Sequence, residues 1–256
     1  MKRVAIVGGA GRMGQAIALG LGTGHDVEVV ALIDVHEPPD LHGARYASTL
    51  EGLDPLDIDV VVDFSVPDGV VASAEWCAKH RVALVVGTTG LSAEQRRAVV
   101  EASSSVGIVI ASNFSIGAVL AERFAAQAAP YFERVEIIEL HHDRKVDAPS
   151  GTSIAAARAI AASRAACGKE PLIDPTQLVS LDGARGANAE GGVRIHSVRL
   201  PGLVAHQEVL FGGPGEGLTI RHDSYDRQSF VQGVLVAVQT IDSAPRLIDG
   251  IASLVT

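Results

Sequence analysis

The chain has 256 residues, of which 47% are hydrophobic and 20% are charged, and its formal net charge is −9 at pH 7. These proportions are those of an ordinary globular protein and exclude a disordered chain. An acidic protein is repelled by the phosphates of nucleic acids and of anionic lipids, so neither nucleic acid nor a membrane is an expected partner.

The cysteines and the N-terminus indicate the compartment. Cys77 and Cys167 are far apart and form no C-x-x-C motif, which predicts free thiols in a reducing compartment. The N-terminal Met-Lys-Arg is followed at once by a short apolar run, which matches neither a signal peptide nor a membrane span. The cytoplasm is therefore the expected location.

The first elements of the chain have the pattern of a dinucleotide-binding unit. An apolar strand over Lys2–Val7 leads into the glycine-rich loop Gly8–Gly14, which opens a helix. A second apolar strand, Val27–Ile33, is followed by Asp34, twenty positions beyond Gly14. In such a unit the glycines let the backbone approach a pyrophosphate, the helix N-terminus balances its charge, and the acid accepts from ribose hydroxyls. The glycine spacing, G-x-x-G-x-x-G, would by itself indicate only a tight turn, but the surrounding elements favour dinucleotide binding.

An alternation of short apolar strands and helices continues, with elements expected over 59–63, 70–79, 82–86, 92–102 and 106–110. Unbroken apolar strands are typical of a parallel sheet covered on both faces, which predicts a Rossmann-like, doubly wound α/β fold. Ligands bind such sheets at the carboxyl ends of the strands. Three loops at these ends are candidates for the site, although each alone could be an ordinary turn: Phe64-Ser65, Gly87–Gly90 and Ala111–Phe114.

A different pattern after Ser115 predicts a second, α+β domain. Helices are expected over 116–128 and 154–166, and strands over 134–140, 193–200, 206–211 and 218–223, with a hairpin loop at 212–217. A helix over 230–241 is expected to pack on the first domain. The expected division is a dinucleotide-binding domain of residues 1–112 and 224–256 and a second domain of residues 113–223. The glycine-rich segment Gly183–Gly192 could be a mobile loop, a lid or a subunit contact.

The stretch His141–Thr152 combines cations, proton carriers and the start of a helix. Ser150 is a preferred N-cap, which leaves the N–H groups of Gly151, Thr152 and Ser153 at the positive end of a helix, a site for an anion. With two histidines and Lys145 beside it, the segment could hold a small anion and move a proton. A solvated loop is the alternative. No zinc site is expected, because the histidines lack i, i+4 spacing and no Cys or Glu cluster lies nearby.

Motifs along the whole chain closely resemble those of the dihydrodipicolinate reductase family of the bacterial lysine and diaminopimelate pathway, whose activity is also called 4-hydroxy-tetrahydrodipicolinate reductase. The matching motifs are V-G-G-A-G-R-M-G at 7–14, V-D-F-S at 62–65, V-G-T-T-G at 86–90, S-N-F-S-I-G at 112–117, E-L-H-H-D-R-K-V-D-A-P-S-G-T at 139–152 and G-L-V-A-H-Q-E-V-L-F-G at 202–212. The resemblance implies NAD(P)H-dependent reduction, with loss of water, of 4-hydroxy-tetrahydrodipicolinate, a small dicarboxylate. It also implies a homotetramer, built through the sheet of the central domain, and a nucleotide domain completed by C-terminal helices.

The resemblance also implies roles for individual residues. The proton donor falls on His141 and the catalytic lysine on Lys145, and the substrate contacts fall on His142, Gly151 and Thr152. Ser153 departs from the family, whose members commonly carry Ala there. The implied cofactor contacts are Gly8, Gly9, Ala10, Gly11, Arg12, Met13, Asp34, Gly87, Thr88, Thr89, Ala111, Ser112, Asn113 and Phe114.

Asp34 also bears on the choice of cofactor. Its charge would lie against the 2′-phosphate of NADPH, and the following Val35 is not a basic residue that would neutralise that phosphate. Arg12 could partly compensate, so NADH is expected to be preferred and NADPH to be used.

Two alternatives to this function remain open. Another nicotinamide reductase, such as an aspartate dehydrogenase-like enzyme, would share the first domain and a proton-donating histidine, but would not need Lys145 together with the P-S-G-T helix start. A nucleotide-sensing protein without turnover would keep the fold alone.

Overall fold

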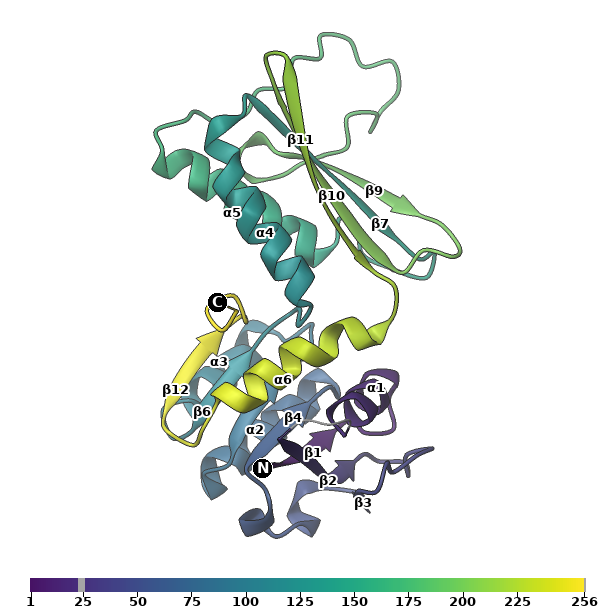
Figure 1. Ribbon diagram of the computed structural model, residues 1–256, viewed down its shortest axis with the longest axis vertical. Coiled ribbons are helices and arrows are strands. Elements are labelled where there is room, and N and C mark those ends of the chain that lie inside the picture. Colours follow the sequence, from purple (N-terminus) through teal and green to yellow (C-terminus); the bar gives the residue numbers. More distant parts are fainter. Residues whose placement is uncertain (23–25, 256) are drawn as a thin grey trace. The chain divides into compact units, whose positions relative to one another are not determined.

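The computed structural model describes residues 1–22 and 26–255 (Figure 1). The chain divides into two compact units, the first formed by Met1–Ile116 with Arg227–Thr256 and the second by Gly117–Asp226. The division expected after residues 112 and 223 lies slightly before the observed one. Phe114 accounts for part of this difference, because it is 1% exposed and packs its ring edge-to-face against Phe64 of the first unit.

The first unit contains a seven-stranded, entirely parallel sheet with the order β12-β6-β5-β4-β1-β2-β3. Its strands are β1 (Lys2–Val7), β2 (Val27–Ile33), β3 (Arg45–Ala47), β4 (Val60–Asp63), β5 (Ala83–Val86), β6 (Gly107–Ile110) and β12 (Arg246–Asp249). From the centre of the sheet, β1, β2 and β3 follow one another toward one edge, and β4, β5 and β6 follow one another toward the other edge. This is the predicted doubly wound order, with its switch point between β1 and β4.

Helices α1 (Arg12–Leu21), α2 (Pro67–His80), α3 (Ala93–Ala102) and α6 (Val231–Thr240) belong to the same unit. The central strands are buried throughout, as their unbroken apolar sequences predict; Val4, Ala5 and Ile6 of β1, for example, are 0% exposed. The prediction that the helix near residues 230–241 packs on the first unit is confirmed, because α6 contacts α1 and β5. The C-terminal segment differs from expectation, since α6 is followed by strand β12 rather than by another α-helix. The four residues of β12 carry no periodic pattern, and their strand conformation comes from pairing with β6.

The second unit has a mixed five-stranded sheet with the order β11-β10-β7-β9-β8. Its elements are α4 (Ile116–Ala128), β7 (Arg134–His141), α5 (Gly151–Ala166), β8 (Ala187–Asn188), β9 (Arg194–Arg199), β10 (Ala205–Gly213) and β11 (Glu216–Ser224). Strand β10 is antiparallel to β7 and β11, whereas β9 is parallel to β7. Helices α4 and α5 lie on one face of this sheet (Figure 1) and bury an apolar core with it, including Ile137, Ile160 and Ile195. The predicted α+β domain is therefore present.

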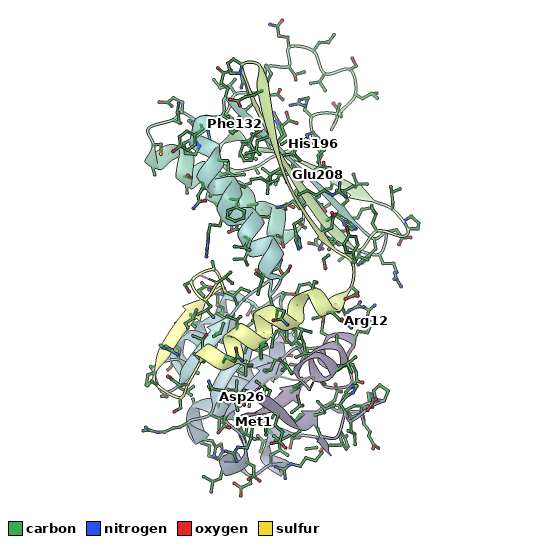
Figure 2. The ribbon with its side chains drawn as sticks, in the orientation of Figure 1. Met1, Arg12, Asp26, Phe132, His196 and Glu208 are labelled. Carbon is green, nitrogen blue, oxygen red and sulfur yellow. The ribbon has the colours of Figure 1, made fainter. Side chains whose placement is uncertain are left out.

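One boundary differs from the predicted one near the His141–Thr152 stretch. Strand β7 extends through His141, so this histidine is part of a strand rather than of a loop. Helix α5 begins at Gly151, directly after the predicted N-cap Ser150, and includes the Ala-rich run from Ile154. The Gly183–Gly192 segment contains β8 and a short 3-10 turn, and Arg185 pairs with Glu136 and Asp174. Figure 2 shows His196, whose ring also contacts Glu136, on the same sheet.

Both cysteines are free thiols, as predicted. Within residues 1–22 and 26–255, no helix has the length and apolar character needed to span a lipid bilayer.

Candidate functional site

The predicted cofactor residues of the first unit follow five adjacent strands. Because these strands are parallel, their carboxyl ends lie along one edge of the sheet. The loops at this edge are Gly8–Gly11 after β1, Asp34 after β2, Phe64-Ser65 after β4, Gly87–Thr89 after β5 and Ala111–Phe114 after β6. The structure thus brings the three candidate loops together with the glycine-rich loop.

Close backbone packing in the glycine-rich loop explains two of its glycines. Gly8 has a φ of +81°, and a β-carbon there would lie 2.4 Å from the Phe64 carbonyl oxygen. A β-carbon on Gly14 would lie 2.2 Å from the Gly8 carbonyl oxygen. Helix α1 has Gly11 as its N-cap, with no side chain capping it and no acidic residue in its first turn. The loop therefore fits the pyrophosphate of a dinucleotide, which needs close backbone approach and an open helix N-terminus.

Asp34 connects the end of β2 to this loop. One carboxylate oxygen accepts the Ala10 N–H at 3.0 Å, and the other accepts the His36 N–H at 3.3 Å. A carboxylate has about four acceptor positions, so two such bonds leave acceptor capacity for ribose hydroxyls. The next residue, Val35, is 80% exposed and brings no positive charge to the position.

Asp63 is a buried carboxylate at the same edge that the sequence prediction did not include in the site. It is 0% exposed and accepts hydrogen bonds from the hydroxyls of Ser65 (2.7 Å), Ser73 (2.6 Å) and Thr88 (2.9 Å), and from the Ser65 N–H (2.9 Å). These bonds connect the loop after β4 to the loop after β5. The sequence carries one signal that could have placed Asp63 in the site: an acidic residue that ends an apolar strand, in the motif V-D-F-S.

The other predicted cofactor residues differ in exposure. Among the described residues, Gly11, Arg12, Thr89 and Ser112 are exposed and could reach a ligand, and Arg12 is labelled at the start of α1 in Figure 2. In contrast, the side chains of Thr88, Ala111 and Phe114 are buried within the unit. Asn113 accepts the Ser115 N–H at 2.8 Å.

His141 ends strand β7 in the second unit, and its Nδ1 is hydrogen-bonded to a carboxylate oxygen of Glu139. Glu139 is 0% exposed and also receives two hydrogen bonds from the guanidinium of Arg199. Burial raises the pKa of Glu139, but hydrogen bonds from His141, Arg199 and Ser197 outweigh that effect and bring the pKa to about 2. This carboxylate is therefore ionised at neutral pH.

Lys145 lies in the turn that follows His142. Its Nζ contacts both carboxylate oxygens of Asp147, at 2.7 and 2.9 Å. The backbone N–H of Lys145 donates to the backbone carbonyl of His142 at 3.2 Å. The Nδ1 atom of His142 is buried and has no hydrogen-bond partner among the described residues. The segment thus places two imidazoles and an ammonium group within five residues of chain.

The start of α5 is capped as predicted, with one correction. The Ser150 hydroxyl accepts the Ser153 N–H at 3.2 Å, so this N–H is not left for an anion. The Ser153 hydroxyl is buried and donates to Gln207 at 2.7 Å, which gives this departure from the family pattern a hydrogen-bonding role. Gly151 and Thr152 occupy the first helical positions, and the α-carbon of Gly151 faces open space.

Comparison with known proteins identifies the family of this chain. Family profiles for the N-terminus and the C-terminus of dihydrodipicolinate reductase match residues 2–114 and 117–254. The chain belongs to the dihydrodipicolinate reductase family. Like that family, it is an NAD(P)H-dependent oxidoreductase. Among the described residues, no group of three or more His, Cys, Asp or Glu side chains is placed to hold a metal ion.

Relatives named 4-hydroxy-tetrahydrodipicolinate reductase match nearly the full chain. The protein of Nocardia farcinica is 48% identical over 254 residues, covering 97% of this chain and 96% of its own length. That of Corynebacterium diphtheriae is 46% identical over 242 residues, covering 93% and 92%. A solved structure of the dihydrodipicolinate reductase of Paenisporosarcina sp. TG-14 with dipicolinate bound is 40% identical, with a TM-score of 0.86 and 99% of each chain covered.

The structure of aspartate dehydrogenase from Thermotoga maritima is also similar, with a TM-score of 0.50 and 14% identity over 93% of this chain and 96% of its own. At this identity the similarity shows a common fold alone. The aspartate dehydrogenase-like alternative therefore gains no support beyond the fold.

Proposed function

We propose that this chain reduces 4-hydroxy-tetrahydrodipicolinate, specifically its (2S,4S) isomer, to tetrahydrodipicolinate in diaminopimelate and lysine biosynthesis. The observation that carries the proposal is the near-full-length match to relatives of that name, together with the family's H-H-x-x-K and P-S-G-T residues in one segment. Substrate, reduced dinucleotide and one proton give tetrahydrodipicolinate, oxidised dinucleotide and water.

In this reaction His141 donates the proton, from Nε2, because its Nδ1 is engaged by Glu139. Lys145 stabilises negative charge that develops during reduction. One carboxylate of the substrate binds the N–H groups of Gly151 and Thr152 at the start of α5, where the helix dipole favours an anion, and His142 contributes a further contact. These assignments explain why the segment concentrates cations in a protein of net negative charge.

Gly8 to Met13, Asp34, Gly87 to Thr89 and Ala111 to Phe114 would hold the cofactor at the carboxyl edge of the parallel sheet. When bound, reduced nicotinamide supplies a hydride from C4 of its ring. The glycine-rich loop and the N-terminus of α1 would bind the pyrophosphate, and Asp34 would accept from the ribose hydroxyls.

An absorbance assay at the nicotinamide band, with freshly prepared 4-hydroxy-tetrahydrodipicolinate, tests the proposed function. Oxidation of NADH that depends on this substrate, and does not occur with oxaloacetate and ammonium, is the expected result. Turnover with the second pair would instead favour the aspartate dehydrogenase-like alternative. Nucleotide binding without turnover of either would favour the binding-protein alternative.

For the choice of cofactor, we expect a lower KM for NADH than for NADPH. Two unit charges 4 Å apart repel by about 1 kcal/mol in water, which corresponds to about a fivefold difference in KM. Replacing Asp34 by Ala should reduce this difference, whereas Glu28→Ala, on the exposed side of the same strand, should leave it unchanged. Steady-state kinetics with both nucleotides measures it, and a KM for NADPH well below that for NADH in the native enzyme would contradict the expectation.

We also propose a homotetramer in the cytoplasm. The sheet of the second unit supports the contact, because Ile138, Leu140 and Leu210 alternate with residues buried under α4 and α5 and are partly exposed on the opposite face. Light scattering after size exclusion should give about four times the chain mass of 26.5 kDa. Leu210→Glu should yield a smaller species, because a charge in an apolar contact is unfavourable. A native mass equal to a single chain would contradict the tetramer.

A further inference from the structure

Glu139 is an unusual residue to find in the core-facing side of a sheet. Along β7 it follows Val135 and Ile137 on the side buried under the helices, and like Ile137 it is 0% exposed. Its antiparallel partner on β10 is Gln207, which is also buried. Burying an ionised carboxylate is costly unless it is paired and fully hydrogen-bonded. Packing alone would be served better by an apolar side chain.

The partners of Glu139 supply those hydrogen bonds. Arg199 binds it through both ends of the guanidinium, with Nη1 to Oε2 at 2.9 Å and Nη2 to Oε1 at 2.8 Å. This two-point geometry restricts rotation of both side chains. Oε2 also accepts from Nδ1 of His141, the proposed proton donor.

Arg199 has a second contact that leads to Lys145. Its Nη2 donates to the carbonyl oxygen of Asp147 at 2.7 Å, and the carboxylate of Asp147 holds the Lys145 ammonium. The Glu139–Arg199 pair is therefore in contact with His141 on one side and with the residue that holds Lys145 on the other. Both proposed catalytic groups are connected to one ion pair, whose carboxylate is buried.

We propose that Glu139 and Arg199 form a positioning pair that directs His141 with Nε2 toward the substrate and fixes the 142–150 turn, and with it Lys145. Glu139 keeps the proton on Nδ1 and the ring in one orientation, and Arg199 holds the turn against the end of β7. Neither residue is proposed to touch the substrate. The inference rests on the proposed function, because it assigns the pair a role in that reaction.

The test compares Glu139→Gln and Arg199→Lys with the control variant Glu133→Gln. Glu133 is an exposed acid directly before the same strand. At metal sites, residues that orient the ligands from outside contribute about 10- to 100-fold to affinity or activity. We expect kcat to fall by about that factor in the two site variants and to stay within about twofold of the native value in Glu133→Gln. The KM for NADH should be unchanged in all three.

A spectroscopic measurement separates positioning from stability. ¹⁵N NMR of histidine-labelled protein, assigned with His141→Ala, should show Nδ1 of His141 protonated in the native protein. In Glu139→Gln the resonance should change at a temperature well below the Tm of the variant, while its size-exclusion profile matches that of Glu133→Gln. Arg199→Lys keeps the test decisive if Glu139→Gln fails to fold, because it retains the charge and loses the two-point contact.

Two results would overturn the inference: native kcat in both site variants, or a loss of kcat that only parallels a loss of Tm, with the His141 resonance unchanged. If the native enzyme itself does not turn over the substrate, the proposed function fails instead, and the NMR measurement still reports whether Glu139 orients His141.

Discussion

Replacing Lys145 by Ala is expected to lower kcat by about 100- to 1,000-fold, the usual loss when a preorganised charge that stabilises a transition state is removed. The side chain of Lys145 has one described partner, the carboxylate of Asp147, whose side chain is 54% exposed. An ion pair this accessible contributes at most about 1 kcal/mol to stability. Activity should therefore fall while the fold is retained, as measured by steady-state kinetics and thermal unfolding.

A matched control for this variant is Lys169→Ala, since Lys169 is an exposed lysine of the same unit. It should leave kcat and Tm within the error of measurement. His141→Ala should lower kcat by about 100-fold or more, because a positioned general acid typically contributes that much. If turnover survives both Lys145→Ala and His141→Ala, the roles assigned to these residues are wrong.

Replacing Asp63 by Ala is expected to lower the free energy of unfolding by about 3 kcal/mol, a large effect for one residue. The substitution removes the carboxylate acceptor of the Ser73 hydroxyl and of the Ser65 N–H, and it leaves the Thr88 hydroxyl with the longer contact, at 3.4 Å, to the backbone carbonyl of residue 63. Each buried polar group that loses its partner costs about 1 to 3 kcal/mol, with partial relief when hydroxyls rotate. Urea unfolding of the native and variant proteins measures the difference.

The same variant should also weaken NADH binding, because Asp63 ties the loop after β4 to the loop after β5 at the cofactor edge. Asp68→Ala is the control: Asp68 is an exposed acid in the first turn of α2, whose loss should cost less than about 1 kcal/mol. Equal stability of Asp63→Ala and Asp68→Ala would show that the hydrogen bonds around Asp63 do not support the edge.

Most of the first unit could be predicted because its signals are local. Unbroken apolar runs mark the buried strands, and the glycines that open α1 mark the loop where backbones approach closely. Strand β12 and the two-residue strand β8 could not be predicted, because their conformation comes from pairing with β6 and β9 rather than from their own sequences. The start of α5 could also be predicted, because Ser150 is a preferred N-cap and the helix begins at Gly151 directly after it.

By itself, the sequence determined the α/β class, the glycine-rich cofactor loop and the cationic stretch beside a capped helix, since each is encoded in residues adjacent along the chain. Only the tertiary structure decided which side chains meet the buried carboxylates of Glu139 and Asp63. Glu139 and Arg199 are 60 positions apart and come together because β7 and β9 pair in parallel, with His141 opposite Arg199. Asp63, at the end of β4, likewise contacts Ser73 because α2 packs against β4. It contacts Thr88 because β5, which precedes Thr88, pairs with β4. Long-range strand register, which no local pattern specifies, is the physical reason for the difference.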